Sequence, residues 1–554
     1  MFYFIVVWLI LLIVCGIIGT GILKGLRVSC FDRMGDRAVL SLWLGVIVMS
    51  IALLVTSWFL PLSPLTGIIL AAIFCGLSFK SARSELVQLF TQLHPKQIPL
   101  LLMLLVGIAA FIMQPVTWMD SGYYHAQVIQ WFGKFGAVPG LALLFNHLGF
   151  TSSWFAFAAP LNAVSLEGRV LAIANGFALL LAILHCGMGL FYIARSQAKL
   201  CDWFIVCFSI ILLPTIVQWN HILAEIFVSP SPDIPVLFIT GTIAWSMIAI
   251  AESEQRSAPQ NRLLPVILAG GAFTFKLIAL PLVAVTGVFY LLNKQLNLKH
   301  LLLSLVILVG LLSPVLIHGV IVSGCPLYPS TKLCFDLPWT PDREAVQQIA
   351  SRTHQWIPEY QSNSSGLVSE IQQRWRWFED FIGNPKIVAS LLLASIVSLI
   401  GLFSIRKRPL GSEWIAGLAI AGITFFFLTS PLTRFWITYL SMLPILWLAI
   451  YCRSQIKLKI AKLPQTVLVV PIFLTTILLF NYLHSHSVAE LLLPPARSSL
   501  PTSQIAVNNI VINVPNEGVH CWATEIPCVP KPQIPKRIQL RDPERGIGAG
   551  FARN

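Results

Sequence analysis

The chain has 554 residues, of which 56% are hydrophobic and 11% are charged, whereas about 25% are charged in an ordinary soluble domain. The mean hydropathy is +0.79. These values exclude a water-soluble globular protein, which would expose too much apolar surface, and they also exclude a disordered chain. The sequence therefore predicts an all-α protein that crosses a membrane many times. We expect no nucleic-acid partner, because Lys and Arg located at membrane edges would explain the net charge of +14 by insertion topology.

Apolar runs of spanning or nearly spanning length follow one another along most of the chain. Residues 1–23 are interpreted as the first span and not as a cleavable signal peptide, because no basic stretch precedes them and no small-residue cleavage site is evident. The runs lie at 1–23, 38–60, 62–78, 98–117, 166–194, 203–219, 234–251, 263–292, 300–323, 386–405, 413–429, 431–451 and 464–483.

The basic residues between these runs give the topology. If the clusters from 24–37 to 453–462 all lie in the cytoplasm, the alternation works only when the run 263–292 crosses twice. Gly270-Gly271 and Pro281 can break a helix there. We expect two short helices that meet near Lys276, toward the outer face. The count is then about 13–14 crossings, with both termini outside the cytoplasm.

This topology divides the chain into five regions. The predicted regions are the accessory helices 1–97, a core at 98–323 that contains a first outer loop at 118–165, an outer loop at 324–385, the C-terminal helices 386–483, and an outer tail at 484–554. Within the tail, residues 505–514 are expected to form a short strand.

The first outer loop carries the main catalytic candidate. Asp120 directly follows a span, and Tyr124 and His125 come shortly after it. Residues 124–135 have the spacing of an amphipathic helix on the membrane surface. A carboxylate at this boundary can act as a general base if its pocket raises its pKa. The alternative is a simple helix-capping aspartate.

Three further charged residues lie near the outer boundary. Asp233 follows Ser231-Pro232 and is either a helix N-cap or a second carboxylate in the same cavity. Lys276 is the sole charge in the run 263–292 and needs a carboxylate or an anionic ligand. Asp233 or Asp120 would be its protein partner, and a phosphate its ligand. Arg434 in a short outer hairpin suits phosphate binding, although it could also extend toward lipid headgroups.

The predicted outer regions contain four cysteines. Short loop closure favours local pairing, Cys325 with Cys334 and Cys521 with Cys528, and free thiols are the alternative. Neither pair has the CxxC spacing of a zinc site.

These features together resemble a known superfamily. The residues Asp120–His125, the stretch 138–155, Ser231-Pro232-Asp233, Lys276 and Cys521-Trp522 are similar to an uncharacterised family of large bacterial GT-C-like membrane proteins. The topology and Asp120 resemble the GT-C superfamily of membrane glycosyltransferases, such as the protein O-mannosyltransferases and the aminoarabinose transferases of lipid A.

The resemblance implies inverting transfer of a sugar from a polyprenyl-phosphate donor to a hydroxyl acceptor on a surface glycan, lipid or protein. The reaction would take place at the outer face of a bacterial plasma membrane. Asp120 would be the general base, and Lys276 and Arg434 would stabilise the departing phosphate. Asp233 would orient Lys276 or bind sugar, and Tyr124 and His125 would shape the acceptor side.

One departure from the superfamily concerns metal. Many members have an Asp-Glu or Asp-x-Asp pair in this loop, whereas Ser121 follows Asp120 here, so a mode without a metal cofactor is favoured. Two alternative functions stay open. One is a transporter or flippase of lipid-linked saccharide. The other is an O-antigen ligase or polymerase, whose chemistry would depend on Arg374, Arg376 and a loop histidine such as His354.

Overall fold

The structure is a computed structural model. It describes residues 1–92, 97–219, 221–256, 258–354, 385–406, 408–429, 432–455, 482, 484, 488–494, 500–535 and 537–554. The predicted span at 464–483 therefore lies outside the described residues, apart from Tyr482.

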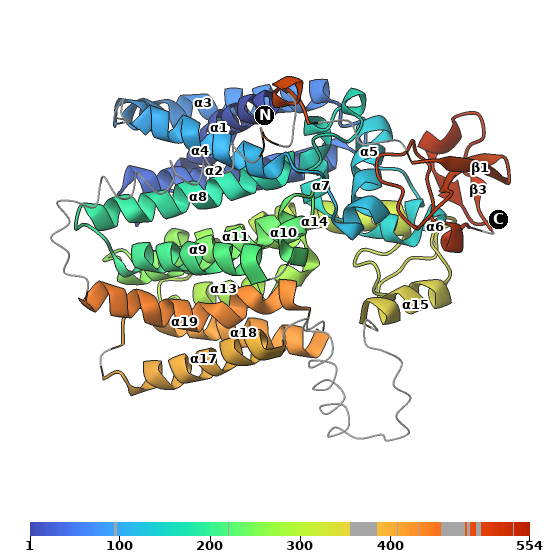
Figure 1. The fold of residues 1–554 in the computed structure, drawn as a ribbon. Helices are drawn as coiled ribbons and strands as arrows, with labels where there is room; N and C mark the ends of the chain where they lie inside the picture. Colours follow the sequence, from blue (N-terminus) through green and yellow to red (C-terminus); the bar gives the residue numbers. More distant parts are fainter. Residues whose placement is uncertain are drawn as a thin grey trace, which may run out of the picture.

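Long apolar helices packed side by side form the body of the molecule (Figure 1). Within the described ranges, eight helices are long and apolar enough to cross a membrane, which confirms a multi-pass α-helical membrane protein. They are α1 (Phe2–Gly25), α2 (Met34–Thr56), α3 (Pro64–Gln92), α8 (Ile173–Ala194), α11 (Asp233–Glu252), α14 (Leu298–Ser323), α18 (Ser412–Thr429) and α19 (Thr433–Gln455). Shorter apolar helices accompany them, namely α4 (Gln97–Ile112), α9 (Leu200–Trp219), α13 (Leu280–Leu291) and α17 (Pro385–Ser404).

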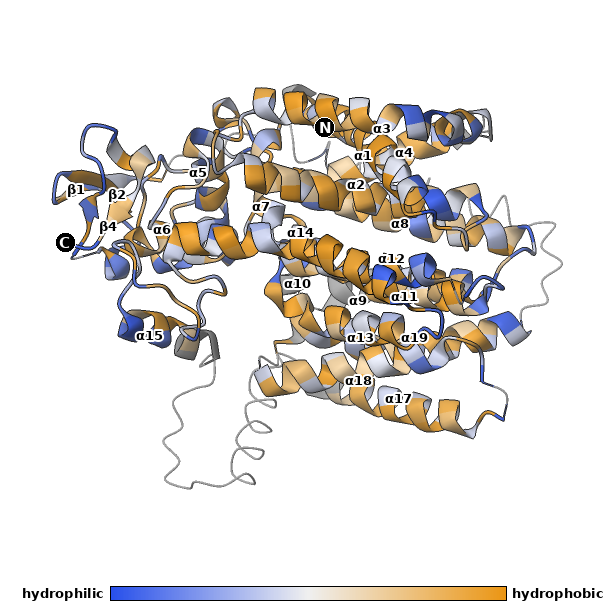
Figure 2. Cartoon of the chain, turned by 180° about the vertical axis from the view of Figure 1, so that it is seen from behind, coloured by the Kyte–Doolittle hydropathy of each residue, from blue (hydrophilic) through white to orange (hydrophobic). Residues whose placement is uncertain are grey.

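Burial separates the centre of this bundle from its rim. The helix α11 is apolar on all sides and 94% of its spanning window is buried, as expected for a helix surrounded by others. In contrast, α3 and α14 keep only 6% and 28% of their windows buried, and large apolar side chains such as Ile68, Leu77 and Val306 are exposed. Figure 2 shows this apolar character along the whole bundle. Such a surface suits contact with lipid.

The predicted break at Lys276 is confirmed. Helix α12 (Pro259–Phe275) ends directly before this residue, whose backbone is extended, with φ −155° and ψ 130°. A short turn at Leu277–Ala279 then leads into α13. The extended residue places a lysine side chain between two helix ends, and this position matters for the site described below.

The first outer loop folds against one end of the bundle (Figure 1). It contains a π-helical turn at Ser121–His125, then α5 (Ala126–Phe135), α6 (Leu141–Leu144) and α7 (Ser153–Ala158). The expected surface helix over 124–135 thus corresponds to the second half of the π turn and α5. Six of the ten residues of α5 are buried, because the C-terminal tail and α7 cover it.

The loop after α14 and the C-terminal tail lie at the same end (Figure 1). The loop contains α15 (Arg343–His354). The tail contains β1 (Thr502–Val507) paired antiparallel with β2 (Ile510–Pro515), and β3 (Gln539–Leu540) paired with β4 (Phe551–Ala552). The prediction of a single strand at 505–514 is therefore wrong. Asn508 and Asn509 both adopt positive φ, 46° and 65°, and turn the chain into a hairpin.

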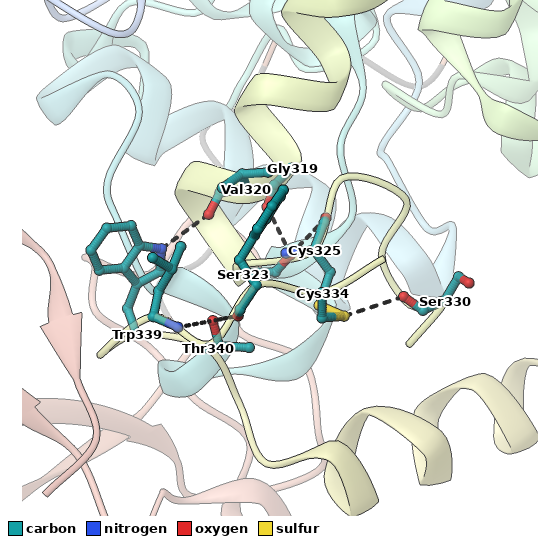
Figure 3. Close-up of a disulfide and its surroundings, with 10 residues drawn as sticks. Gly319, Val320, Ser323, Cys325, Ser330, Cys334, Trp339 and Thr340 are labelled. Atoms are coloured by element: carbon teal, nitrogen blue, oxygen red, sulfur yellow. Dashed lines mark hydrogen bonds between the residues drawn. A yellow bond between two sulfur atoms is a disulfide. The ribbon is translucent and has the colours of Figure 1, made fainter. Parts of the chain in front are cut away.

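Two local disulfides hold these outer regions. Cys325 is joined to Cys334, and Cys521 is joined to Cys528. Figure 3 shows the first of them at the end of α14, where Trp339 Nε1 donates a hydrogen bond to the carbonyl of Val320 at 3.0 Å. Arg553 near the C-terminus pairs with Asp336 of this loop at 2.8 Å. Loop and tail therefore form one connected layer.

The N-terminus lies at this end of the bundle as well. The hydroxyl of Tyr3 donates to the carbonyl of Leu161 in the first outer loop at 2.8 Å, and Tyr3 N donates to the carbonyl of Leu492 at 3.4 Å. Both ends of the chain are thus on one side of the helical bundle.

Candidate functional site

Four charged side chains from distant parts of the chain meet at the end of the bundle beneath the first outer loop. Lys276 forms an ion pair with Asp233, and Arg434 lies between both aspartates, with Nη1 3.4 Å from Asp120 Oδ2 and Nε 3.9 Å from Asp233 Oδ2. We call Asp120, Asp233, Lys276 and Arg434 the charged quartet. Two anions and two cations balance each other here.

Asp120 is carried by a helical segment with an irregular turn. It directly precedes the π turn Ser121–His125, whose defining bond runs from Ala126 N to the carbonyl of Ser121. Single π turns are rare within helices and are frequent at functional sites. The side chain of Asp120 is 27% exposed, the highest value in the quartet. It is therefore the carboxylate that an incoming molecule would meet first.

Asp233 opens α11 and is buried, with a side-chain exposure of 7%. Its role as an N-cap is not what the structure shows, because Pro232 occupies the N-cap position. The carboxylate instead accepts a hydrogen bond from Ser231 Oγ at 3.1 Å and pairs with Lys276. Asp233 thus neutralises the cation that the helix break brings into the apolar core.

The first outer loop is tied to the broken helix immediately before Lys276. Ser152 Oγ donates to the carbonyl of Phe275 at 2.6 Å, and Ser153 Oγ donates to Thr274 Oγ1 at 2.9 Å. Both serines are buried. Ser152 satisfies the carbonyl of Phe275, which the end of α12 leaves without a helical partner, and both serines fix the loop relative to Lys276.

A buried asparagine that sequence reasoning missed connects the two outer turns. Asn175 on α8 accepts a hydrogen bond from Trp154 Nε1 at 2.9 Å and donates to the carbonyl of Ser231 at 3.0 Å. Its exposure is 0%. The available signal was an amide side chain inside an otherwise apolar run, since a buried amide requires partners. Asn175 places the turn before Asp233 against the loop that carries Asp120.

Aromatic rings enclose the two cations. The guanidinium carbon of Arg434 lies 5.0 Å from the ring centre of Trp118 and 4.9 Å from that of Phe435. The ammonium of Lys276 lies 4.4 Å from the centre of the Phe435 ring. Such cation–π contacts stabilise a charge in surroundings poor in water. They leave the edge of the Arg434 guanidinium available for further hydrogen bonds.

Tyr124 and His125 adjoin the quartet. The ring of His125 is 1% exposed and packs 5.0 Å from Phe155 and 4.4 Å from Tyr124, centre to centre. Burial lowers the pKa of His125 to about 4, and burial followed by the charge of Asp120 raises the pKa of Tyr124 well above its usual value. Both side chains are therefore neutral at pH 7 and can hydrogen-bond uncharged groups.

Several polar atoms around the quartet lack hydrogen-bond partners within the described part of the chain. They are Trp118 Nε1, Ser121 Oγ, His125 Nδ1 and Arg434 Nε. Arg434 and Asp233 also line a small cavity between α11, α18 and α19. Buried polar atoms normally find partners. These polar atoms without hydrogen-bond partners among the described residues indicate a place that receives water or polar ligand groups.

The sequence also singled out three residues of the outer loop and four cysteines. Arg374 and Arg376 fall outside the described residues. His354 is the last residue of α15. The four paired cysteines hold the outer layer and do not line the quartet. In the described ranges, no group of three or more His, Cys, Asp or Glu side chains could hold a metal ion.

The comparisons with known proteins identify a family but no activity. A family described as a domain of unknown function, DUF8201, matches residues 1–441, and the chain therefore belongs to this family. The matched region includes all four residues of the quartet and ends before the tail. No curated protein and no solved structure matches the chain.

Proposed function

We propose that this member of the DUF8201 family is a membrane glycosyltransferase that moves a sugar from a polyprenyl-phosphate donor to a hydroxyl acceptor. The observation that carries the proposal is the charged quartet, in which Arg434 lies between Asp120 and the Asp233–Lys276 pair. A transferase of this kind needs a base for the acceptor and cations for the leaving phosphate within a few ångströms of each other.

Asp120 is the base in this proposal. It is more exposed than Asp233, and within the described part of the chain it forms a single ion-pair contact, the long one to Arg434, whereas Asp233 is occupied by Lys276 and Ser231. The acceptor oxygen would attack the anomeric carbon of the sugar while its proton passes to Asp120. The bond between that carbon and the phosphate oxygen breaks, and the configuration inverts.

Lys276 and Arg434 receive the leaving group. The polyprenyl phosphate gains negative charge as its bond to the sugar breaks, and two cations already oriented by aromatic rings and Asp233 stabilise that charge without reorganising. Within the described residues Arg434 Nε makes no hydrogen bond, only the 3.9 Å contact with Asp233, and can turn to a phosphate oxygen, which guanidinium groups bind well. The position at one end of an apolar bundle suits a donor whose lipid chain stays in the membrane.

His125 and Tyr124 complete the proposal on the sugar or acceptor side. Both are neutral and adjoin the quartet, so they can bind hydroxyl groups without competing with Lys276 and Arg434 for the phosphate. The acceptor would thus be recognised by hydrogen bonds from uncharged groups, and the donor by charge.

The test uses a strain from which the gene has been deleted. Mass spectrometry of lipid-linked sugars and surface glycans compares this strain with strains that express the wild-type chain, Asp120→Asn or Glu413→Gln. The matched control removes an exposed carboxylate at the start of α18. We expect the lipid-linked sugar to accumulate after deletion and to be consumed again with wild type and Glu413→Gln, but not with Asp120→Asn at equal protein level. Full restoration by Asp120→Asn would refute the proposal.

A further inference from the structure

The C-terminal tail contacts the segment that carries Asp120. Trp522 N donates a hydrogen bond to the carbonyl of Gly122 at 2.9 Å, although the two residues are 400 positions apart in the chain. The indole ring also lies against Gly122, because a Cβ at this position would come within 2.4 Å of Trp522 Cε2. Gly122 belongs to the π turn, two residues after Asp120.

The tail makes further contacts along α5. Gln127 Nε2 donates to the carbonyls of Thr524 and Trp522, at 3.0 and 3.4 Å, and Gln127 is 0% exposed. Lys134 pairs with Glu525 at 3.0 Å. These contacts all come from residues 522–525 of the tail. One short tail segment therefore holds the π turn and the helix that follows it.

The tail segment is itself held in an unusual conformation. Trp522 has φ +46°, a left-handed backbone that bulky residues rarely adopt. It directly follows Cys521, whose disulfide partner is Cys528. The backbone of Cys528 forms a β-bridge with Asn513 of the β1–β2 hairpin. Disulfide and hairpin together anchor the tryptophan on a closed loop. Residues with such strained backbones occur where their position matters for function.

We propose that Trp522 is a positioning residue that fixes the π turn and thereby sets the location of Asp120 relative to Arg434. The proposal rests on the function proposed above. Asp120 and Arg434 are separated by 3.4 Å, a long contact for an ion pair, so that little within the quartet holds Asp120 in place. The tail supplies this constraint from the other side of the turn. Trp522 is 8% exposed and acts through Gly122.

The consequence is that removing the ring displaces the catalytic carboxylate without removing it. A displacement of about 1 Å in a catalytic group can reduce a rate about 100-fold. We therefore expect Trp522→Ala to lower kcat about 10- to 100-fold with the donor KM changed less than about threefold, because Lys276 and Arg434 remain in place. Trp522→Phe keeps a ring against Gly122 and should recover most of the lost kcat.

The experiment combines two independent measurements on the purified full-length protein. Hydrogen–deuterium exchange followed by mass spectrometry reports the protection of amides in 121–127, and turnover is measured with the lipid-linked sugar extracted from the deletion strain. Wild type is compared with Trp522→Ala, Trp522→Phe, Gly122→Ala and the double variant Gly122→Ala/Trp522→Ala. Val511→Ala, on the exposed side of β2, is the matched tail control.

We expect faster exchange in 121–127 and lower kcat for Trp522→Ala and for Gly122→Ala, whose methyl group collides with the ring. The double variant should be no worse than Trp522→Ala alone, because the methyl group then meets no ring. Val511→Ala should resemble wild type in both measurements. Wild-type exchange in Trp522→Ala, or faster exchange with an unchanged kcat, would overturn the positioning role. Absence of turnover in the wild type would refute the proposed function, and the exchange measurement would still decide whether Trp522 fixes the turn.

Discussion

Two charge clusters occupy opposite ends of the bundle, and their geometry differs. At the end away from the outer loops, Arg33 binds both oxygens of Asp202 at 2.7 and 2.8 Å and donates to Asp36 at 2.7 Å. Asp202 also accepts from Lys199 N at 2.7 Å. In the charged quartet, Arg434 reaches its two carboxylates only at 3.4 and 3.9 Å.

Under the proposed function, this difference distinguishes a structural cluster from a substrate-binding one. All three guanidinium nitrogens of Arg33 have a carboxylate partner, and its ring contact with Tyr192 is short, at 3.8 Å. The protein's own carboxylates therefore already engage each nitrogen of this guanidinium. Arg434 Nε is buried without a hydrogen-bond partner, as is His125 Nδ1 nearby. An arginine with unused donors beside an accessible carboxylate is the arrangement expected of a site that a substrate completes.

Matched Asp→Asn substitutions test this contrast, and the largest effect is expected at Asp120. Asn is isosteric but cannot take up the proton of an acceptor hydroxyl. We expect Asp120→Asn to reduce kcat about 100- to 10,000-fold, the usual contribution of a general base, with an unchanged thermal unfolding midpoint. The kcat is measured as turnover of extracted lipid-linked sugar by the purified protein. A large loss of stability instead would place Asp120 among the structural residues.

At the other end, Asp202→Asn should behave in the opposite way. The substitution leaves the partly buried Arg33 with one carboxylate, and breaking a pair whose aspartate is buried costs about 3–5 kcal/mol. We expect a loss of about this size in the free energy of unfolding, measured by denaturant titration in mixed micelles. Turnover per folded molecule should stay within about twofold of wild type. A strong loss of turnover in the folded fraction would show that the two clusters are not independent.

The sequence predicted the elements of the quartet because each has a local signal. Lys276 is a lone charge in an apolar run, and α12 ends at Phe275 directly before it, whereas the expected helix breakers Gly270-Gly271 lie within α12. The topology inferred from the basic residues also placed Asp120 and Arg434 at the same membrane boundary, and the two side chains lie 3.4 Å apart. Short loop closure favoured two local disulfides over free thiols, and the structure contains both bonds.

The parts that escaped prediction are contacts between distant segments. The hydrogen bonds of Asn175 and the contact of Trp522 with Gly122 join residues far apart in the chain, and no local pattern specifies such partners. The π turn next to Asp120 has no sequence signature either. The Asn508-Asn509 turn was readable, since asparagine tolerates positive φ, but the surrounding apolar residues suggested one continuous strand.

Lowering the pH should decrease the stability of the folded protein, because His125 beside the charged quartet is buried in its neutral form. Its pKa is about 4 in the folded chain and about 6.5 when unfolded. As the pH falls from 6.5 toward 4, the unfolded chain binds a proton that the folded chain does not, so stability decreases by about 2 kcal/mol between pH 7 and pH 5. His125→Gln should lose less stability over this interval, as measured by unfolding midpoints at both pH values. Equal losses in both proteins would contradict the prediction.

The smallest effect is expected for Arg434→Lys, which tests whether the hydrogen-bond donors of Arg434 bind the donor phosphate. Lysine retains the positive charge but lacks the planar fork, so Arg434→Lys should still neutralise the aspartates while binding a phosphate oxygen less well. We expect the donor KM to rise about tenfold, which corresponds to about 1.4 kcal/mol, with little change in unfolding midpoint. The matched variant Arg33→Lys loses the paired bonds to Asp202 and should lower the midpoint while leaving the donor KM unchanged. If both variants altered stability and neither altered KM, the two clusters would have the same structural role.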